Sequence, residues 1–248
     1  MLMILVNGLI ISQALKSPDG RLEFDFMMSK GGIPYYTLKL DNEYVIRESA
    51  LGIMIKDDPG FIDELAIVST QNSNFDETWQ PVLGEEKEIR NNYNQFTVTL
   101  QNIDSKKEMS IVFRLFNDGL GFRYEFPQME NQRYFTIMGE KTEFRLSGDH
   151  KTFWIPGDFD SNEYPYMTSK LSEVDAEKGQ GFFEISTRRI IAHNAVQTPL
   201  MMKSDNGVYI NIFEAAVTNY PVMHLLVDKS EFSLKTAFAP DAVGNIAY

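Results

Sequence analysis

Short runs in which apolar and polar residues alternate recur along most of the chain. Alternation with a period of two, in runs rich in Phe, Tyr, Val, Ile and Thr, is typical of β-strands that bury one face. The strands expected from this pattern span residues 22–26, 35–41, 96–100, 109–116, 122–126, 142–146, 208–213, 224–227 and 232–238.

Turn-forming residues separate these runs and supply Gly or Asn where a positive φ is needed. The turn sequences are S-P-D-G from Ser17, K-G-G from Lys30, L-D-N from Leu40, N-D-G from Asn117 and S-D-N-G from Ser204. No segment carries a sustained apolar stripe with a 3.6-residue period, and the best helical candidate, Glu48–Ile55, is short. Many strands joined by short turns predict an all-β fold, a large antiparallel sandwich rather than a βα repeat.

Composition narrows the functional classes. The chain has 248 residues, of which 43% are hydrophobic, which is enough for a sizeable core in one domain. Its formal charge of −12 disfavours nucleic acid as a partner. Acidity suits a neutral or cationic ligand such as a sugar or a metal ion, or serves solubility alone. The absence of cysteine excludes disulfides, thiolate zinc sites and cysteine nucleophiles.

The first fourteen residues, MLMILVNGLIISQA, are apolar and uncharged and end on the small Ala14. They resemble the hydrophobic part of a signal peptide before a cleavage site, which predicts export and a mature domain over residues 15–248. The alternative is an ordinary apolar first strand. The other end of the sequence, residues 240–248, stops without a final strand or capping signal, so we expect the natural polypeptide to be longer.

The stretch WIPGDFDSNEYPY, residues 154–166, fits neither a helix nor a strand and is expected to be a loop. Asp158, Asp160 and Glu163 fall close together in it, and Glu173 and Asp175 follow. Carboxylates gathered on a turn can supply oxygen ligands to Ca²⁺, although the spacing is not that of an EF-hand. The alternative is a solvated acidic loop.

The same stretch holds the aromatic residues Trp154, Phe159, Tyr164 and Tyr166. Their rings could form a sugar-stacking surface or anchor an interface. Packing of the loop against the body of the protein is an equally good interpretation.

The remaining candidates have weaker patterns. His150, His193 and His224 lack the spacing of a metal pair, and His224 lies in an alternating run where packing is expected. The chain contains no G-x-S-x-G, P-loop or G-x-G-x-x-G sequence. Glu214 sits in the apolar segment I-F-E-A-A and needs a partner, for which a buried salt bridge is favoured over a ligand-facing role.

Several stretches together resemble, in this order, the N-terminal domain of glycoside hydrolase family 97. They are SPDGRL from Ser17, WQPVLGE from Trp79, NNYNQFTVTL from Asn91, FNDGLGFRYEFP from Phe116, WIPGD from Trp154 and FEAAVTNY from Phe213. The resemblance covers nearly the whole chain. One departure is Leu83, which stands where the family commonly has a tryptophan.

The resemblance implies a fold and a role. The family contains bacterial, calcium-dependent α-glucosidases and α-galactosidases, whose first domain is a β-supersandwich similar to galactose mutarotase. A catalytic (β/α)8 barrel follows that domain in the family. We therefore expect a periplasmic accessory domain without catalytic residues of its own, with the barrel and an α-glucoside or α-galactoside as partners.

The resemblance also implies a site. In the family, a glutamate of the N-terminal domain reaches the active site and helps to hold calcium, and the matching position here is Glu163. The loop would leave the sandwich to dock on the barrel, with Glu214 as a second candidate ligand. The residues expected to face the barrel or the substrate are Trp154, Asp158, Asp160, Tyr164 and Tyr166. Because Ca²⁺ takes six to eight oxygens, the isolated chain should bind it weakly.

Three other functions remain open from the sequence. One is a stand-alone carbohydrate-binding module. Another is a mutarotase-like enzyme, which needs His193 or His224 to meet an acid such as Glu214 in a groove of the sheet. The third is a structural interface domain with an exposed apolar patch.

Overall fold

The computed structural model describes residues 5–6, 9–127, 134–179, 189–218 and 220–240. Contacts between Cα atoms divide the chain into two compact units, which are described separately below. Unit 1 comprises residues 1–44 and 59–133, and unit 2 comprises residues 45–58 and 134–248. The expectation of one domain over residues 15–248 stays a prediction.

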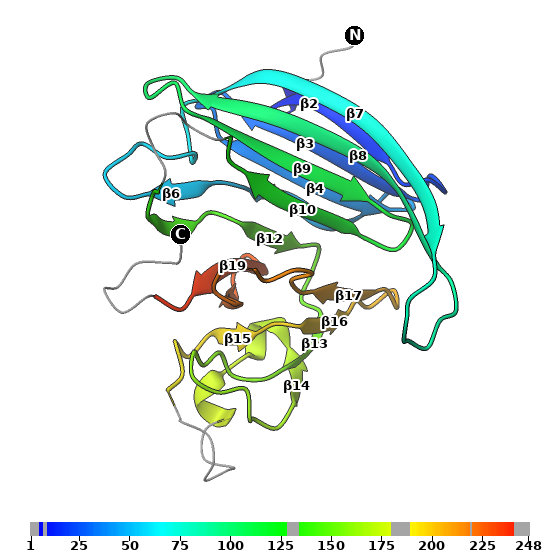
Figure 1. Cartoon of the computed structure of the whole chain (residues 1–248). Helices are drawn as coiled ribbons and strands as arrows, with labels where there is room; N and C mark the ends of the chain where they lie inside the picture. The colour runs from blue at the N-terminus through cyan, green and yellow to red at the C-terminus, as the bar shows by residue number, and fades with distance from the viewer. Residues whose placement is uncertain (1–4, 7–8, 128–133, 180–188, 219, 241–248) are drawn as a thin grey trace. The chain divides into compact units, whose positions relative to one another are not determined.

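Unit 1 contains two groups of antiparallel strands (Figure 1). The first follows chain order: β1 (Leu5–Val6), β2 (Leu9–Lys16), β3 (Leu22–Ser29) and β4 (Pro34–Leu40). The second is a sheet in the order β10-β9-β8-β7. Its strands are β7 (Leu65–Trp79), β8 (Ile89–Asn102), β9 (Glu108–Leu115) and β10 (Leu120–Glu125).

The core of unit 1 contains a cluster of phenylalanine rings from both groups of strands. Phe24 of β3 lies 4.5 Å from Phe113 of β9, and Phe26 lies 5.8 Å from Phe96 of β8, measured between ring centroids. All four side chains are fully buried. Offset and tilted ring pairs at these separations add to the stability gained from burying apolar area. Two sheets therefore pack face to face, as the alternating patterns predict.

Strand β2 includes much of the segment that resembles a signal peptide. Leu15 pairs with Phe24 and Ala14 with Asp25, so the end of this segment is part of the antiparallel ladder with β3. This pairing agrees with the interpretation of the segment as an apolar first strand, which was the alternative to a signal peptide. Removal of the segment in a mature protein stays a prediction.

Unit 2 contains two larger sheets and one strand pair. One sheet has the order β5-β12-β19-β18-β15, formed by β5 (Glu43–Ala50), β12 (Glu143–Leu146), β19 (Ser233–Phe238), β18 (Met223–Asp228) and β15 (Ala195–Gln197). The other has the order β14-β13-β16-β17, formed by β14 (Met167–Lys170), β13 (Lys151–Trp154), β16 (Leu200–Lys203) and β17 (Tyr209–Ile212). Strand β6 (Ile53–Ile55) pairs with β11 (Ile137–Glu140).

The all-β, antiparallel fold class is confirmed, and each strand expected from alternation overlaps a strand of the structure. The short helical candidate Glu48–Ile55 does not form a helix, in keeping with the all-β prediction. Strand β5 ends at Ala50, Gly52 follows, and β6 begins at Ile53. Strand β6 pairs with β11, and β5 pairs with β12 just before the segment, where Ile46 lies opposite Leu146. A short apolar run does not distinguish a strand from a helix without such a partner.

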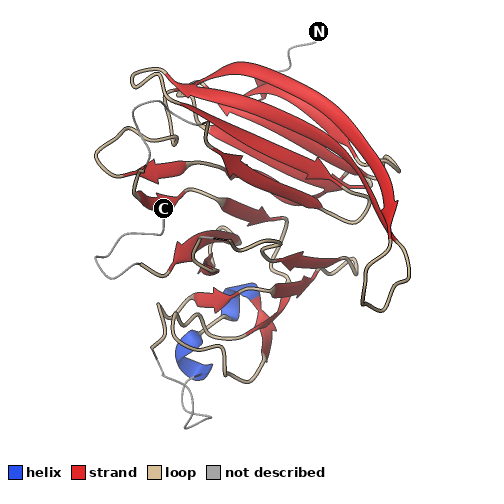
Figure 2. Cartoon of the chain, viewed as in Figure 1, coloured by secondary structure: helices blue, strands red, loops and turns tan. Residues whose placement is uncertain are grey.

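Helical structure is limited to two 3-10 turns in the described residues, η1 (Leu171–Glu173) and η2 (Ala176–Gly179) (Figure 2). No helix in these parts of the chain is long and apolar enough to cross a membrane.

Candidate functional site in the β13–β14 loop

The aromatic and acidic stretch identified in the sequence forms the connection between β13 and β14. The two strands pair antiparallel up to Trp154 and Met167, and residues 155–166 make the loop between them. Most hairpin loops have about 2–5 residues. A longer connection needs internal support if it is to hold a side chain in place, and several residues supply that support here.

Asp158 is the internal anchor of the loop. Its side chain is buried, and its Oδ1 accepts hydrogen bonds from the backbone N–H groups of Asp160 (2.8 Å) and Ser161 (3.2 Å). Its Oδ2 accepts hydrogen bonds from the Tyr164 hydroxyl (2.6 Å) and the Arg189 backbone N–H (3.0 Å). One carboxylate therefore closes the turn and ties it to a segment distant in sequence.

The base of the loop lies directly against β15. Gly157 N–H donates to the Ala195 carbonyl at 2.8 Å, and the Gly157 carbonyl accepts from Ile191 N–H at 2.8 Å. A Cβ atom on Gly157 would lie 2.6 Å from the Ala195 Cβ and 3.0 Å from its carbonyl carbon. Only glycine permits this approach, which explains the glycine of the W-I-P-G-D sequence.

The side chains of Gln197 and His224 also bind the backbone of the loop. Gln197 Nε2 donates to the carbonyl oxygens of Pro156 (3.0 Å) and Ser161 (2.7 Å). His224 Nε2 lies 3.0 Å from the Asp158 carbonyl oxygen, so this nitrogen carries the proton in the hydrogen bond. The ring of Phe159 meets the His224 ring edge-on at 5.1 Å. Burial lowers the pKa of His224 below its ordinary 6.5, which favours the neutral ring.

Asp160 and Glu163 are both exposed, and Glu163 is the one of the two without a recorded side-chain partner among the described residues. Its backbone N–H donates to Ser161 Oγ at 3.2 Å, while its side chain is exposed. The structure records no hydrogen bond or ion pair of the Glu163 carboxylate with the residues it describes. By contrast, Asp160 forms an ion pair with Arg189 at 3.2 Å. Of the three acids in the loop, one anchors it, one is paired and one is available.

The aromatic residues divide into a buried and an exposed pair. Trp154 is 2% exposed and its Nε1–H donates to Ser169 Oγ at 3.0 Å, and Tyr164 is 9% exposed. Phe159 and Tyr166 are 37% and 70% exposed. Trp154 and Tyr164, like Asp158, therefore support the loop from within, and Tyr166 is the residue of this set placed to meet a partner.

Glu214 has a different partner from the one expected. Its side chain is half-buried, and its Oε2 accepts a hydrogen bond from the Met223 backbone N–H at 2.8 Å. The salt bridge favoured from the sequence is absent among the described residues. A main-chain amide satisfies the carboxylate instead, a solution that sequence spacing does not reveal. Glu214 and the exposed Glu163 share no recorded contact.

The acids of the loop do not form a complete metal site. No group of three or more His, Asp or Glu side chains suited to a metal ion occurs in the described part of the chain. Asp158 already accepts four hydrogen bonds and Asp160 is paired with Arg189, so Glu163 fits calcium as a single ligand among the six to eight that the ion takes.

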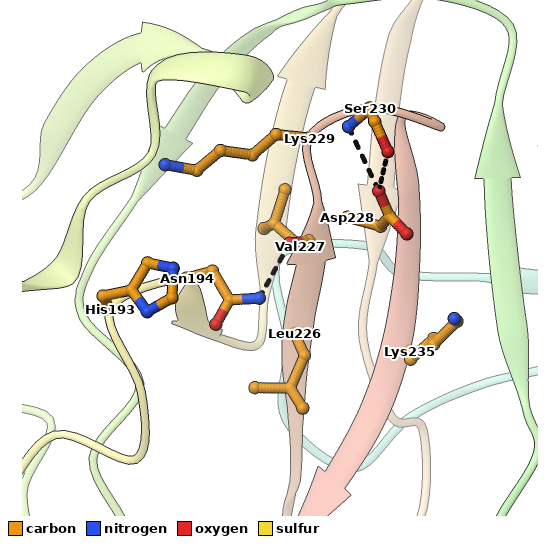
Figure 3. Close-up of a pocket in the computed structure, with 8 residues that line it drawn as sticks. All are labelled: His193, Asn194, Leu226, Val227, Asp228, Lys229, Ser230 and Lys235. Atoms are coloured by element: carbon orange, nitrogen blue, oxygen red, sulfur yellow. Dashed lines mark hydrogen bonds between the residues drawn. The ribbon is translucent and has the colours of Figure 1, made fainter.

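A shallow depression lies elsewhere in unit 2, at the end of β18 (Figure 3). Its lining includes His193, Asn194, Asp228 and Lys229. Asn194 Nδ2 donates to the Val227 carbonyl at 2.8 Å, so this side chain is committed to the backbone.

A mutarotase-like enzyme needs a histidine and an acid that meet in a groove, and Glu214 lies near enough to His224 for its charge to act on the ring. His193 lies in the depression, whereas Glu214 does not line it. His224 is buried and directed at the Asp158 carbonyl. Neither histidine forms a hydrogen bond or ion pair with Glu214 among the contacts of the described residues.

The sequence did not point to Arg189, Ile191, Ala195 or Gln197 as parts of the site. None of them lies in a motif, and they reach the loop only through the fold. The glycine in W-I-P-G-D was the visible signal that another backbone passes close by.

The architecture defines a class, that of multi-sheet antiparallel β-sandwich domains with a long, internally braced loop. A family model described as glycosyl-hydrolase 97 N-terminal matches residues 15–240, which include residues of both units. The chain belongs to this family, and its fold is the β-supersandwich of these N-terminal domains.

Individual relatives agree with this assignment. The chain is 22% identical over 238 residues to a retaining alpha-galactosidase of Bacteroides thetaiotaomicron, covering 91% of this chain and 32% of that protein. A glycoside hydrolase family 97 enzyme from Pseudoalteromonas sp. strain K8, solved with panose and with acarbose, superposes with a TM-score of 0.81 at 27% identity, covering 95% of this chain and 33% of that one. A beta-arabinopyranosidase shares the fold at 18% identity, with a TM-score of 0.80 over 95% of this chain and 37% of its own. The chain thus spans about a third of the length of these relatives.

Proposed function

We propose that this chain is the accessory domain of an exported glycoside hydrolase acting on α-glucosides or α-galactosides, and that it forms one wall of the active site. In this proposal a catalytic (β/α)8 barrel supplies the acid and base that glycosidic cleavage requires. The chain's own contribution is to place Glu163 where it completes a calcium site. The identity of the relatives as an alpha-galactosidase and a family 97 enzyme supports the choice of substrates.

One observation carries the proposal. Glu163 presents an exposed carboxylate, with no recorded partner among the described residues, on a loop whose other acids are engaged. Fixing the backbone of this loop costs conformational entropy. A functional need to hold the exposed Glu163 side chain in one position explains why the loop is nevertheless fixed. Calcium held by Glu163 together with oxygens of the barrel would act as a Lewis acid beside the sugar.

The remaining loop residues have supporting roles in this proposal. Asp158, Tyr164 and Trp154 hold the loop from within, and the exposed Tyr166 offers a ring to the barrel or to a sugar. Glu214 supports the segment before β18 through the Met223 amide.

The test joins the chain to the catalytic domain of a family 97 relative and measures hydrolysis of aryl α-glucosides and α-galactosides at increasing calcium. Glu163→Gln should raise the calcium concentration needed for half-maximal activity at least 10-fold. Glu177→Gln, a change at another exposed acid of unit 2, serves as the matched control and should leave it unchanged. An E163Q fusion with the calcium dependence of the parent would refute the role of Glu163.

A structural interface domain is the second candidate, because the β7–β8 hairpin exposes apolar side chains at its tip. Val82 and Leu83 are 98% and 90% exposed, and Trp79 is 48% exposed. Exposed apolar patches mark protein contacts. If the chain restores activity of the barrel equally well with and without Glu163, this second function is favoured over calcium binding.

A further inference from the structure

The outward face of the β14-β13-β16-β17 sheet carries an unusual row of lysines. Lys151 of β13 lies directly opposite Lys170 of β14 on one side and Lys203 of β16 on the other. The row ends at Tyr209 of β17, which pairs with Lys203. Neighbouring strands lie about 4.8 Å apart, so three positive side chains stand side by side across three strands.

Such an arrangement is unfavourable unless an opposite charge compensates it, because like charges directly opposite each other destabilise a sheet. Lys170 is compensated, since its Nζ lies 3.2 Å from Asp205 Oδ1 and 3.0 Å from the Asp149 carbonyl oxygen. For Lys151 and Lys203 the structure records no ion pair with the described residues. On a chain with a formal charge of −12, two uncompensated neighbouring lysines stand out.

Ring and apolar side chains accompany the lysines on the same face. The Nζ of Lys203 lies 4.9 Å from the centroid of the Tyr209 ring, and the Nζ of Lys151 lies 5.4 Å from that of Phe153. A second row runs beside the lysines, in which Phe153 lies opposite Met201. Tyr209 is 57% and Met201 is 37% exposed, so the face is open.

We propose that this face binds a polyuronate, that is, a polysaccharide that carries carboxylates along its chain. The lysine row, which crosses the strands, would lie along the polymer, with the ammonium groups of Lys151 and Lys203 meeting its carboxylates. Tyr209 and Phe153 would offer ring faces to the sugars. The site lies in unit 2 but uses none of the β13–β14 loop residues, so it stands independently of the calcium role of Glu163.

Three observations favour a polysaccharide over other ligands. Protein interfaces are depleted in lysine, so a row of three speaks against a protein partner. The acidic chain repels the dense phosphate backbone of nucleic acid more strongly than a polymer with one carboxylate per sugar. The face is also a sheet surface rather than the depression of Figure 3, and a flat face suits a polymer better than a single small sugar.

The experiment measures binding of the full chain to polygalacturonate by titration calorimetry and by affinity electrophoresis at low salt. The fully methyl-esterified polymer is the matched ligand, because it keeps the sugars and removes the charges. We expect the chain to bind polygalacturonate and not the esterified polymer. Salt at 0.5 M should weaken this binding at least 10-fold, since salt screens exposed charges.

The decisive variant is Lys151→Gln/Lys203→Gln, which should weaken binding at least 10-fold. Lys56→Gln/Lys141→Gln removes the same charge from exposed lysines elsewhere in unit 2 and should stay within 2-fold of the parent. The K151Q/K203Q protein should be at least as stable in urea as the parent, because the repulsion between two neighbouring like charges is removed. Equal loss in both double variants would overturn the proposal.

Three other results would overturn it as well. The first is absence of binding to polygalacturonate, and the second is equal binding of the esterified polymer. The third is a DNA duplex bound as tightly as the polyuronate, which would show unspecific attraction of polyanions. Self-association in sedimentation experiments that K151Q/K203Q abolishes, without any binding of polygalacturonate, would assign the face to a second copy of the chain instead.

Discussion

Tyr164 donates its hydroxyl hydrogen to Oδ2 of Asp158 at 2.6 Å, and both side chains are buried beneath the loop that they belong to. This bond joins the two halves of the β13–β14 loop across Glu163, which lies between them in sequence and is exposed. A buried pair that a loop makes with itself fixes the path of the backbone. The exposed acid is therefore presented by a braced segment rather than by a free one.

Removal of this bond should loosen the loop without unfolding the protein. Tyr164→Phe removes one donor from Oδ2 of Asp158 and should cost about 1–2 kcal/mol in the free energy of unfolding, measured in urea. Asp158→Ala strands four donors and should cost about 3 kcal/mol or more. Asp160→Asn, at an exposed ion pair, should change stability by less than about 1 kcal/mol. Similar losses for all three variants would contradict the anchoring role of Asp158.

The contact between Gly157 and Ala195 gives a second prediction. Gly157→Ala should destabilise unit 2 by about 2–3 kcal/mol, because the new methyl group would lie 2.6 Å from the Ala195 Cβ. Adding Ala195→Gly should recover part of this loss, since it removes one of the close atoms but not the backbone. Gly121→Ala, at a site with open space around the new Cβ, is the control and should be close to neutral in thermal melts.

The buried histidines should make stability depend on pH. Burial lowers the pKa of His224 below 6.5, so the unfolded chain binds this proton more readily than the folded one. The free energy of unfolding that His224 contributes is therefore highest above pH 6.5, the pKa of this residue in the unfolded chain. It decreases as the pH falls from 6.5 toward the lower pKa of the folded protein. Burial also lowers the pKa of His150, with the same sign.

The measurement is the free energy of unfolding in urea from pH 5.5 to 7.5. His224→Gln, which keeps a donor for the Asp158 carbonyl, should flatten the profile, and His150→Gln should remove a further part. Burial raises the pKa of Glu140 above 4.5, an effect of opposite sign that all these variants retain. An unchanged slope in H224Q would show that this ring does not contribute.

The apolar tip of the β7–β8 hairpin should affect association and not stability. Leu83 is 90% exposed, so Leu83→Ser should change the free energy of unfolding by less than about 0.5 kcal/mol. The same change should lower any concentration-dependent association seen by light scattering, because it removes exposed apolar area. Val98→Ser, at a fully buried position of β8, is the contrasting variant and should be strongly destabilising. Association that persists unchanged in L83S would mean that the tip is not a contact surface.

Calcium binding by the chain alone gives a further prediction. Because Glu163 supplies one ligand where six to eight are needed, titration of the isolated chain with calcium should show millimolar affinity or weaker. The isolated chain should also fail to hydrolyse aryl α-glucosides and α-galactosides. Micromolar calcium binding or calcium-dependent turnover by this chain would contradict the proposed division of labour.

The sequence alone determined the strands, because side-chain alternation is a local property of an extended backbone. Runs such as residues 22–26 and 96–100 kept their period of two and buried the phenylalanines that it placed inside. The order of short motifs likewise gave the family. At Glu48–Ile55 the sequence pattern alone did not distinguish a short helix from a strand, and pairing of Ile53–Ile55 with β11 decided for a strand.

Only the tertiary structure decided which acids of the β13–β14 loop are available. Asp158 and Glu163 look alike in the sequence, yet one is buried and the other exposed. The difference comes from partners remote along the chain, the Arg189 amide and the His224 ring, which lie 31 and 66 positions from Asp158. The lysine row was also decided by the tertiary structure. The register between β13, β14 and β16 places its three charges side by side, and the spacing of lysines within one strand does not reveal this.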